Sequence, residues 1–246
     1  MQPEKGILSV RQGHKDTVRW MNSESFTEMK LLFDRVTGKG SVYFRPTDRG
    51  VVIIVLDEEA SSYVSFRTEA EDQAYLLAVG SPVPAEDDLR RRYRAFAIWL
   101  AGVQRSSEEE RAVIPWIRSS LSSNLLLPGM DSQWLFLNQE WRFQDENGKA
   151  KKSDVLAVQM PTGRLGIIEV KNSYSGKERA LEQIRQYGSF WQRDQKELQS
   201  FFTDVLNMMG KLYDNQWAMT AQVSNEPAAL FFAYPGPSGL CIEQME

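Results

Sequence analysis

Two carboxylates and a lysine within Ser153–Lys171 have the spacing expected of a site that cleaves phosphodiesters. Asp154 stands at the head of one apolar strand, and Glu169 and Lys171 stand at the foot of the next. Because side chains of a strand alternate between its two faces, Glu169 and Lys171 share one face. Two carboxylates beside an ammonium group can hold a divalent cation and a water molecule next to a phosphate. The residue types therefore indicate metal-dependent hydrolysis.

The turn between the two strands decides whether the three charges meet. Pro161-Thr162-Gly163-Arg164 has turn composition, and a loop of these residues pairs Leu156 with Glu169 and Asp154 with Lys171. In that register Asp154 lies on the face of Glu169 and diagonal to it, with backbones about 7–8 Å apart. A slip of one residue would move Asp154 to the opposite face and destroy the site.

A surface hairpin with charged ends is the alternative interpretation of these residues. The strand interiors oppose it, because Val155–Val158 and Ile167–Ile168 are apolar on both faces, as central buried strands are. Ionised groups at the end of a buried strand are costly unless they are paired or bound to metal. We therefore favour a metal site.

The composition limits which ions such a site could hold. Cys241 is the only cysteine and His14 the only histidine, which excludes cysteine-based zinc or iron–sulfur sites and multi-histidine centres. His14 stands in a polar stretch, and we expect it to be exposed. Oxygen ligands remain, and these favour Mg²⁺ or Mn²⁺.

The chain has 246 residues, of which 42% are hydrophobic and 25% charged, as in a globular protein of one or two domains. No apolar run approaches the roughly 20 residues that span a bilayer. The first residues lack the long apolar core of a secretory signal, so a cytoplasmic location without membrane contact is expected.

A net charge of −4 argues against indiscriminate binding of nucleic acid. Two local basic segments exist, Arg90–Arg94 and Lys149–Lys152. The second directly precedes Asp154, where it could meet phosphates. Ordinary solvated charge is the alternative for both segments, and for Arg90–Arg94 it is the interpretation we favour.

Residues 1–84 are expected to form a separate α+β region of unknown role. Ser25 to Glu28 resembles a capping box, and apolar residues at helical spacing follow it. Candidate strands then alternate with turn-like segments, at 41–45, 51–56, 63–67 and 74–79. Ser81-Pro82-Val83-Pro84 is the expected boundary, so residues 85–246 would form the second domain.

The second domain is expected to alternate helices and strands. An apolar stripe from Leu89 to Val103 predicts an amphipathic helix. Pro115 lies within the next expected helix, at 108–127, and should kink or restart that helix. The remaining elements are expected at 108–127 (helix), 133–143 (strand), 153–171 (hairpin), 177–198 and 199–213 (helices), and 217–223 and 229–234 (strands).

The order helix, three strands, helix, strand resembles that of the PD-(D/E)XK phosphodiesterases. In that superfamily the second and third core strands carry Asp and (Asp/Glu)-x-Lys, which match Asp154, Glu169 and Lys171. Ser153 replaces the proline of the motif. The resemblance covers roughly residues 105–235 and implies an α/β fold with a restriction-endonuclease-like core, a mixed central sheet flanked by helices.

The helix after the hairpin carries a second resemblance. Gln183-Ile184-Arg185-Gln186-Tyr187 is similar to the Gln-x-x-x-Tyr signature of the recombination-exonuclease branch. Residues four apart share a helix face, so Gln183 and Tyr187 could both point at the catalytic edge. A polar helix face with a partly buried tyrosine is the alternative. The cysteines that bind an iron–sulfur cluster in some members of that branch are absent.

The superfamily usually adds an acidic residue from its first core helix. Glu110 is the candidate, because it shares a helical face with Ile114, Ile117 and Leu121. Ser107 to Glu110 is also a capping box, which would make Glu110 a helix-start residue only. Glu140 is another possibility.

The resemblance implies that Asp154, Glu169 and the carbonyl of Val170 bind Mg²⁺ beside the scissile phosphate. Lys171 would orient the attacking water or neutralise the transition state, and Gln183 and Tyr187 would contact the phosphate backbone or support the ligands. DNA is the expected substrate, and a homodimer would place two such sites on a duplex. A nuclease-like module that binds nucleic acid or a protein without turnover is the alternative. No glycine-rich phosphate loop or Gly-x-Ser-x-Gly elbow supports a small-molecule enzyme.

Overall fold

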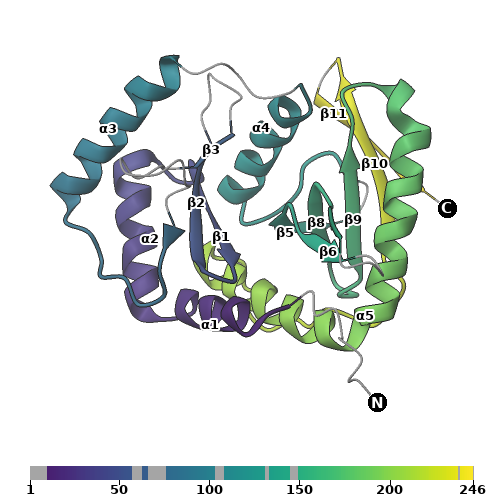
Figure 1. Ribbon diagram of the computed structural model, residues 1–246, viewed down its shortest axis with the longest axis horizontal. Helices are drawn as coiled ribbons and strands as arrows, with labels where there is room; N and C mark the ends of the chain where they lie inside the picture. Colours follow the sequence, from purple (N-terminus) through teal and green to yellow (C-terminus); the bar gives the residue numbers. More distant parts are fainter. Residues whose placement is uncertain are drawn as a thin grey trace.

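The described residues form two larger β-sheets and a two-stranded ribbon, with helices packed around the sheets (Figure 1). The computed structural model describes residues 10–56, 63–65, 76–102, 108–130, 133–144, 149–237 and 239–245. The N-terminal sheet is antiparallel and contains β1 (Val42–Thr47), β2 (Gly50–Leu56), β3 (Tyr63–Ser65) and β4 (Leu76–Leu77). Three helices accompany this sheet, α1 (Gln12–Met21), α2 (Glu24–Thr37) and α3 (Glu86–Gly102).

The second sheet is mixed and has five strands in the order β11-β10-β9-β8-β5. Their bounds are β5 (Trp134–Gln139), β8 (Val155–Gln159), β9 (Leu165–Val170), β10 (Ala229–Gly236) and β11 (Gly239–Met245). Neighbours are antiparallel except β9 and β10, which run parallel. This parallel pair needs a crossover, and the long helix α5 (Lys177–Leu212) supplies most of it.

Helices cover both faces of the mixed sheet, so its central strands are buried. Helix α4 (Glu108–Ser122) lies on one side and α5 on the other (Figure 1). Every residue of β9 is buried, as the two-sided apolar sequence predicts. A two-stranded ribbon, β6 (Arg142–Gln144) and β7 (Ala150–Lys152), is inserted between β5 and β8. The predicted α/β class is confirmed.

The two sheets share one continuous hydrophobic core. A buried polar contact crosses between them, because the Tyr43 hydroxyl donates to Asn138 Oδ1 at 2.6 Å. The hydroxyl of Tyr213, at the end of the helix Lys177–Leu212, donates to the Val42 carbonyl at 3.3 Å. The predicted boundary at 81–84 falls in the coil between β4 and α3. The division into two domains stays a prediction.

Several predicted helix limits are wrong. Ser23, not Ser25, caps α2, because its hydroxyl accepts the Phe26 N–H at 3.3 Å. Helix α4 continues through Pro115 and ends at Ser122, short of the expected 127. Pro115 is exposed, so the carbonyl that it leaves without an N–H partner can bond to water. The expected break at 198/199 is instead a kink at Asp194 inside α5.

Three strand predictions also need correction. The segment 217–223 is not a strand, because Asn207 Nδ2 donates to the carbonyls of Ala218 and Ala221 and holds it in turns. The expected strand 133–143 is split into β5 and β6 at Glu140, whose φ is 58°. Strand β11 was not anticipated.

No helix among the described residues is both long and apolar enough to span a membrane.

Candidate functional site

The register of β8 and β9 places Asp154, the residue before β8, across from Glu169 near the end of β9. The observed pairs are Val155 with Ile168 and Leu156 with Ile167, so the next position places Asp154 opposite Glu169. The predicted pairing of Asp154 with Lys171 is therefore wrong by two residues. A shift of two preserves the face of each side chain, and it brings the two carboxylates closer than the diagonal arrangement would.

The turn explains this shift in register. The Met160 N–H donates to the Gln133 carbonyl at 2.8 Å, on the side of β5, so Met160 does not pair with Leu165. Gln159 pairs with Arg164 instead, and the Gly163 N–H closes the turn on the Gln159 carbonyl at 2.9 Å. Gly163 has a φ of 74°, which favours glycine.

The Asp154 carboxylate is oriented by the backbone of Val170. The Val170 N–H donates to Asp154 Oδ2 at 2.7 Å. The Lys171 N–H bonds to the Ala233 carbonyl on the β10 side, and successive residues alternate sides, so the N–H and carbonyl of Val170 both point toward β8. The Val170 carbonyl therefore lies at the same edge as Asp154.

Glu169 and Lys171 form a largely buried ion pair at the end of β9. Lys171 Nζ lies 2.6 Å from Glu169 Oε1, and the two side chains are only 12% and 3% exposed. A short helical turn, η1 (Tyr174–Gly176), packs on the lysine. A Cβ at Gly176 would lie 2.9 Å from Cβ and Cγ of Lys171, so only glycine leaves room for the lysine stem.

Helix α5 adds Gln183 and Tyr187 to the same place. Tyr187 is 2% exposed, stacks on Phe143 at 5.6 Å, and donates its hydroxyl to the Lys152 carbonyl at 2.7 Å. Burial, then the charges of Glu169 and Asp154, raise the pKa of Tyr187 well above its ordinary value, and a hydrogen bond with Gln183 partly offsets this. The Tyr187 hydroxyl thus holds the strand segment that leads into Asp154.

The backbone of Glu140 contacts that of Asp154, but the Glu140 carboxylate is paired with basic side chains. The Glu140 N–H donates to the Asp154 carbonyl at 3.0 Å, while the carboxylate pairs with Arg45 at 2.6 Å and with Lys152. Burial would raise the pKa of Glu140, but the hydrogen bond to Lys152 and the charge of Arg45 outweigh it, so the pKa is lowered. Glu140 links β1 to the strand that precedes Asp154.

The candidate Glu110 stands in the first turn of α4, which covers the face opposite α5 (Figure 1). Its side chain and Ser107 lie outside the described residues, so both the catalytic and the capping interpretations stay predictions. Within the part of the chain that the structure describes, no group of three or more His, Cys, Asp or Glu side chains could hold a metal ion.

The donors that do come together are all oxygens. They are the carboxylates of Asp154 and Glu169 and the Val170 carbonyl, and a hard cation such as Mg²⁺ or Mn²⁺ suits this set. A carboxylate has two oxygens with several acceptor directions, so the bond that orients Asp154 is compatible with cation binding. The ammonium of Lys171 lies beside them.

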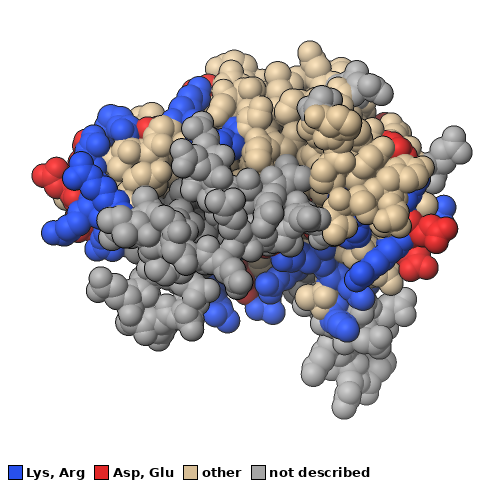
Figure 2. All heavy atoms as spheres, turned by 90° about the horizontal axis from the view of Figure 1, so that it is seen from above, with Lys and Arg blue, Asp and Glu red and all other residues tan. Residues whose placement is uncertain are grey.

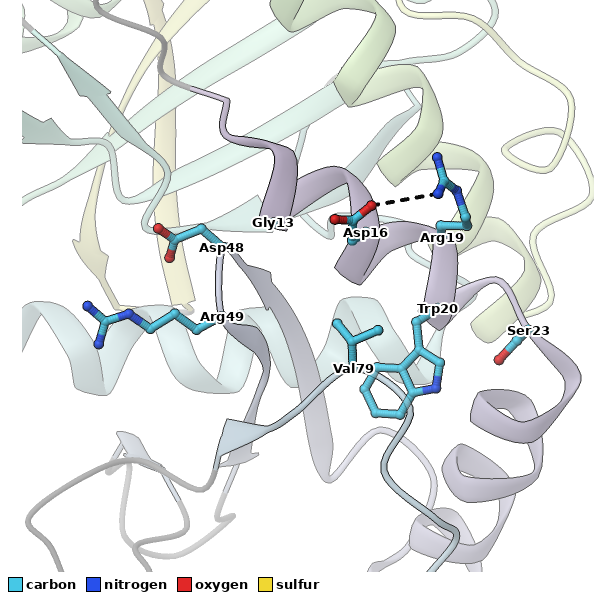
Figure 3. Close-up of a pocket in the computed structure, with 8 residues that line it drawn as sticks. All are labelled: Gly13, Asp16, Arg19, Trp20, Ser23, Asp48, Arg49 and Val79. Carbon is cyan, nitrogen blue, oxygen red and sulfur yellow. Dashed lines mark ion pairs between the residues drawn. The ribbon is translucent and has the colours of Figure 1, made fainter.

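Other charged features lie away from this site. Basic side chains gather at the left of Figure 2, the side of α3. There Arg90 pairs with Glu86 at 2.6 Å, and Arg92 pairs with Asp88 at 2.7 Å, as ordinary solvated charge does. A hollow of about 640 Å³ between α1 and the β1–β2 turn contains none of the candidate residues (Figure 3).

His14 is not exposed as expected. It is half-buried, its Nδ1 accepts the Arg11 N–H at 3.2 Å, and its ring lies 5.5 Å from that of Trp141. Burial lowers the pKa of His14. Gly176 was also missed, because a glycine in a polar loop carries no signal that distinguishes packing from chain flexibility.

Neither a family model, nor a curated protein, nor a solved structure matches this chain.

Proposed function

We propose that this chain is a metal-dependent nuclease that hydrolyses phosphodiester bonds, with DNA as its substrate. The order α4, β5, β8, β9, α5, β10 supports a restriction-endonuclease-like core of the PD-(D/E)XK type. In such a core the motif residues fall at adjoining ends of two neighbouring strands, as Asp154, Glu169 and Lys171 do here.

One observation carries the proposal: Asp154 lies across from buried Glu169 and is held there by the Val170 N–H at 2.7 Å. Two carboxylates at neighbouring positions at the end of a buried sheet repel each other, which is costly unless a cation offsets their charge. Lys171 supplies one positive charge, and a divalent ion would supply the rest.

The residues divide the chemistry between them. Asp154, Glu169 and the Val170 carbonyl would hold the divalent ion, which when bound stabilises negative charge on the phosphate and lowers the pKa of a water molecule. Lys171 holds an ammonium group beside the reacting phosphate, where it orients the attacking water and offsets the charge that develops during in-line attack. Its buried stem fixes that position.

Tyr187 and Gln183 act through the ligands. Tyr187 is 2% exposed and so has little surface that a phosphate could contact, and its hydroxyl already donates to the Lys152 carbonyl. We therefore assign Tyr187 to positioning Asp154, with Gln183 one turn earlier on the same helix face. This is one of the two roles that the Gln-x-x-x-Tyr resemblance implies, the other being contact with the phosphate backbone.

A module that binds nucleic acid or a protein without turnover is the second candidate. It is favoured by the absence of a third carboxylate beside Asp154 and Glu169 among the described side chains. Lys149 and Lys151, on or beside the β6–β7 ribbon, could serve such binding equally well.

Cleavage of a mixed panel separates the two candidates. Purified protein is incubated with linear, circular, single-stranded and branched DNA and Mn²⁺. Lys171→Met removes the ammonium and keeps the stem. Lys30→Met is the matched control, because Lys30 is also buried and ion-paired, with Asp34 at 2.6 Å on α2.

We expect the parent to cut at least one substrate, Lys171→Met to lose about 100-fold or more, and Lys30→Met to lose little once its folded fraction is matched. A parent that shifts DNA without product supports the binding module. Parental cleavage by Lys171→Met contradicts the assignment of this site.

A further inference from the structure

Three aromatic rings form a cluster beside the candidate site, and one of them is exposed to solvent. Tyr174 of η1 lies edge-to-face on Phe232 at 6.2 Å and on Tyr234 at 5.3 Å, and the two β10 rings stack on each other at 5.3 Å. Phe232 is fully buried, Tyr234 is half-buried and Tyr174 is 53% exposed. The set therefore runs from the core out to solvent, and we call it the aromatic platform.

The register of the sheet places this platform next to the charged residues. Phe232 pairs with Glu169, and Ala233 pairs with Val170, so Tyr234 follows at the position beside Lys171. Residues that pair across two strands share a face, and so Phe232 and Tyr234 lie on the face of Glu169 and Lys171. A substrate held at the carboxylates would have the platform as its immediate neighbour.

Tyr174 is exposed but held in place. Lys177 Nζ lies 5.1 Å from the centre of the Tyr174 ring and 3.3 Å from its hydroxyl. Together with the contacts to Phe232 and Tyr234, these contacts hold the Tyr174 ring in place. A ring that is already ordered loses little conformational entropy when a ligand stacks on it.

The charge near the platform is balanced. Lys177 Nζ lies 2.6 Å from Glu243 Oε2, and hydrogen bonds to Glu243 and Tyr174 raise the pKa of Lys177. The pair contributes little net attraction for a phosphate. Any affinity that the platform provides must come from its rings.

We infer that the aromatic platform stacks an unpaired base of single-stranded DNA whose backbone enters the carboxylate site. The inference rests on the proposed function, because it names the form of substrate that this same site takes. Every base has a π-face, and stacking on aromatic side chains is the sequence-tolerant way in which proteins bind single strands. In a duplex those faces are covered by neighbouring bases, so Tyr174 could not reach them.

The test measures binding without turnover. A labelled single-stranded oligonucleotide and its duplex are titrated in EDTA and followed by fluorescence anisotropy, with an RNA strand of the same sequence as a third arm. Tyr174→Ala removes the ring, and Tyr174→Phe keeps it. Leu31→Ala is the matched control, because Leu31 is 49% exposed on α2, far along the chain.

We expect Tyr174→Ala to weaken single-strand binding by about 5- to 150-fold, the range for loss of one base stack. Tyr174→Phe and Leu31→Ala should bind as the parent does, and duplex binding should not change. Because the platform carries balanced charge, the ratio of parent to Tyr174→Ala affinity should be the same at low and high salt.

Equal affinity of Tyr174→Ala and the parent for the single strand would overturn the inference, as would a loss confined to RNA or to duplex. These outcomes are separate from failure of the proposed function. A protein that stacks single strands through Tyr174 but never cleaves them would refute the nuclease, whereas one that cleaves duplex without any effect of Tyr174 would refute only the platform.

Discussion

Gly176→Ala should disable the candidate site by moving Lys171. A Cβ at Gly176 would lie 2.9 Å from both Cβ and Cγ of Lys171. Carbon atoms pack at about 3.5–4.0 Å, so the lysine stem or the η1 turn must move by about 0.6–1.1 Å. The bond from Lys171 Nζ to Glu169 Oε1 is 2.6 Å, and a shift of this size would carry it toward or past the limit of a hydrogen bond.

A displacement of about 1 Å at a reacting group costs on the order of 100-fold in rate, so we expect a loss of about 10- to 100-fold. The φ of Gly176 is −78°, which alanine accepts, so the folded state should survive with a loss of about 1 kcal/mol from crowding. Gly188→Ala is the matched control. Its Cβ would meet only the tip of Leu230 at 3.4 Å, and alanine in mid-helix should add about 0.5–1 kcal/mol.

The assay is the initial rate of cleavage with saturating Mn²⁺, measured beside thermal unfolding of each variant. Parental cleavage by Gly176→Ala would refute the reasoning. So would an equal loss in both glycine variants, because general crowding near α5 would then explain the effect.

Three further changes test the contacts around the site. Glu140→Gln should lower the free energy of unfolding by about 1–3 kcal/mol at neutral pH, because Arg45 loses its charged partner. The pKa of Glu140 in the folded protein is lowered from 4.5, so the stability that its carboxylate contributes is present above pH 4.5 and is lost as the pH falls through the folded-state pKa. The difference in denaturation midpoint between the parent and Glu140→Gln should therefore be smaller at pH 4 than at pH 7. Tyr187→Phe should cost about 1–2 kcal/mol in urea denaturation, since the Lys152 carbonyl loses its donor; an unchanged midpoint would remove Tyr187 from the positioning of Asp154. Burial lowers the pKa of His14 from 6.5, so the unfolded chain binds a proton more readily than the folded protein. The free energy of unfolding should therefore fall as the pH is lowered through about 6.5. The His14→Phe variant should lack this fall between pH 7 and 5.

The strands that carry the candidate residues could be predicted because they are buried on both faces. Val155 to Val158 and Leu165 to Val170 are apolar runs closed by a turn, and each forms a strand within a residue of its expected limits. Alternation then places Glu169 and Lys171 on one face whatever the loop does. The composition of the turn was not enough to define the register, because a bond from Met160 to Gln133 on another strand decided it.

Long-range contacts account for the other errors. The sequence of the segment 217–223 does not indicate that Asn207, on α5, donates to two carbonyls of this segment and keeps the segment out of a sheet. The half-burial of His14 depends on Trp141 and Phe201, which are distant in sequence. The packing of Gly176 on Lys171 likewise exists only once η1 has folded over β9.

Binding of Mn²⁺ measured by calorimetry tests most directly whether Asp154 and Glu169 act together on a cation. Asp154→Asn keeps an oxygen for the Val170 N–H and removes the charge, and Asp48→Asn is the control at an ion pair with Arg11. We predict that the parent and Asp48→Asn bind Mn²⁺ alike, and that Asp154→Asn binds it at least about 10-fold more weakly. Equal affinity in Asp154→Asn, or no binding by the parent, would contradict the proposed site.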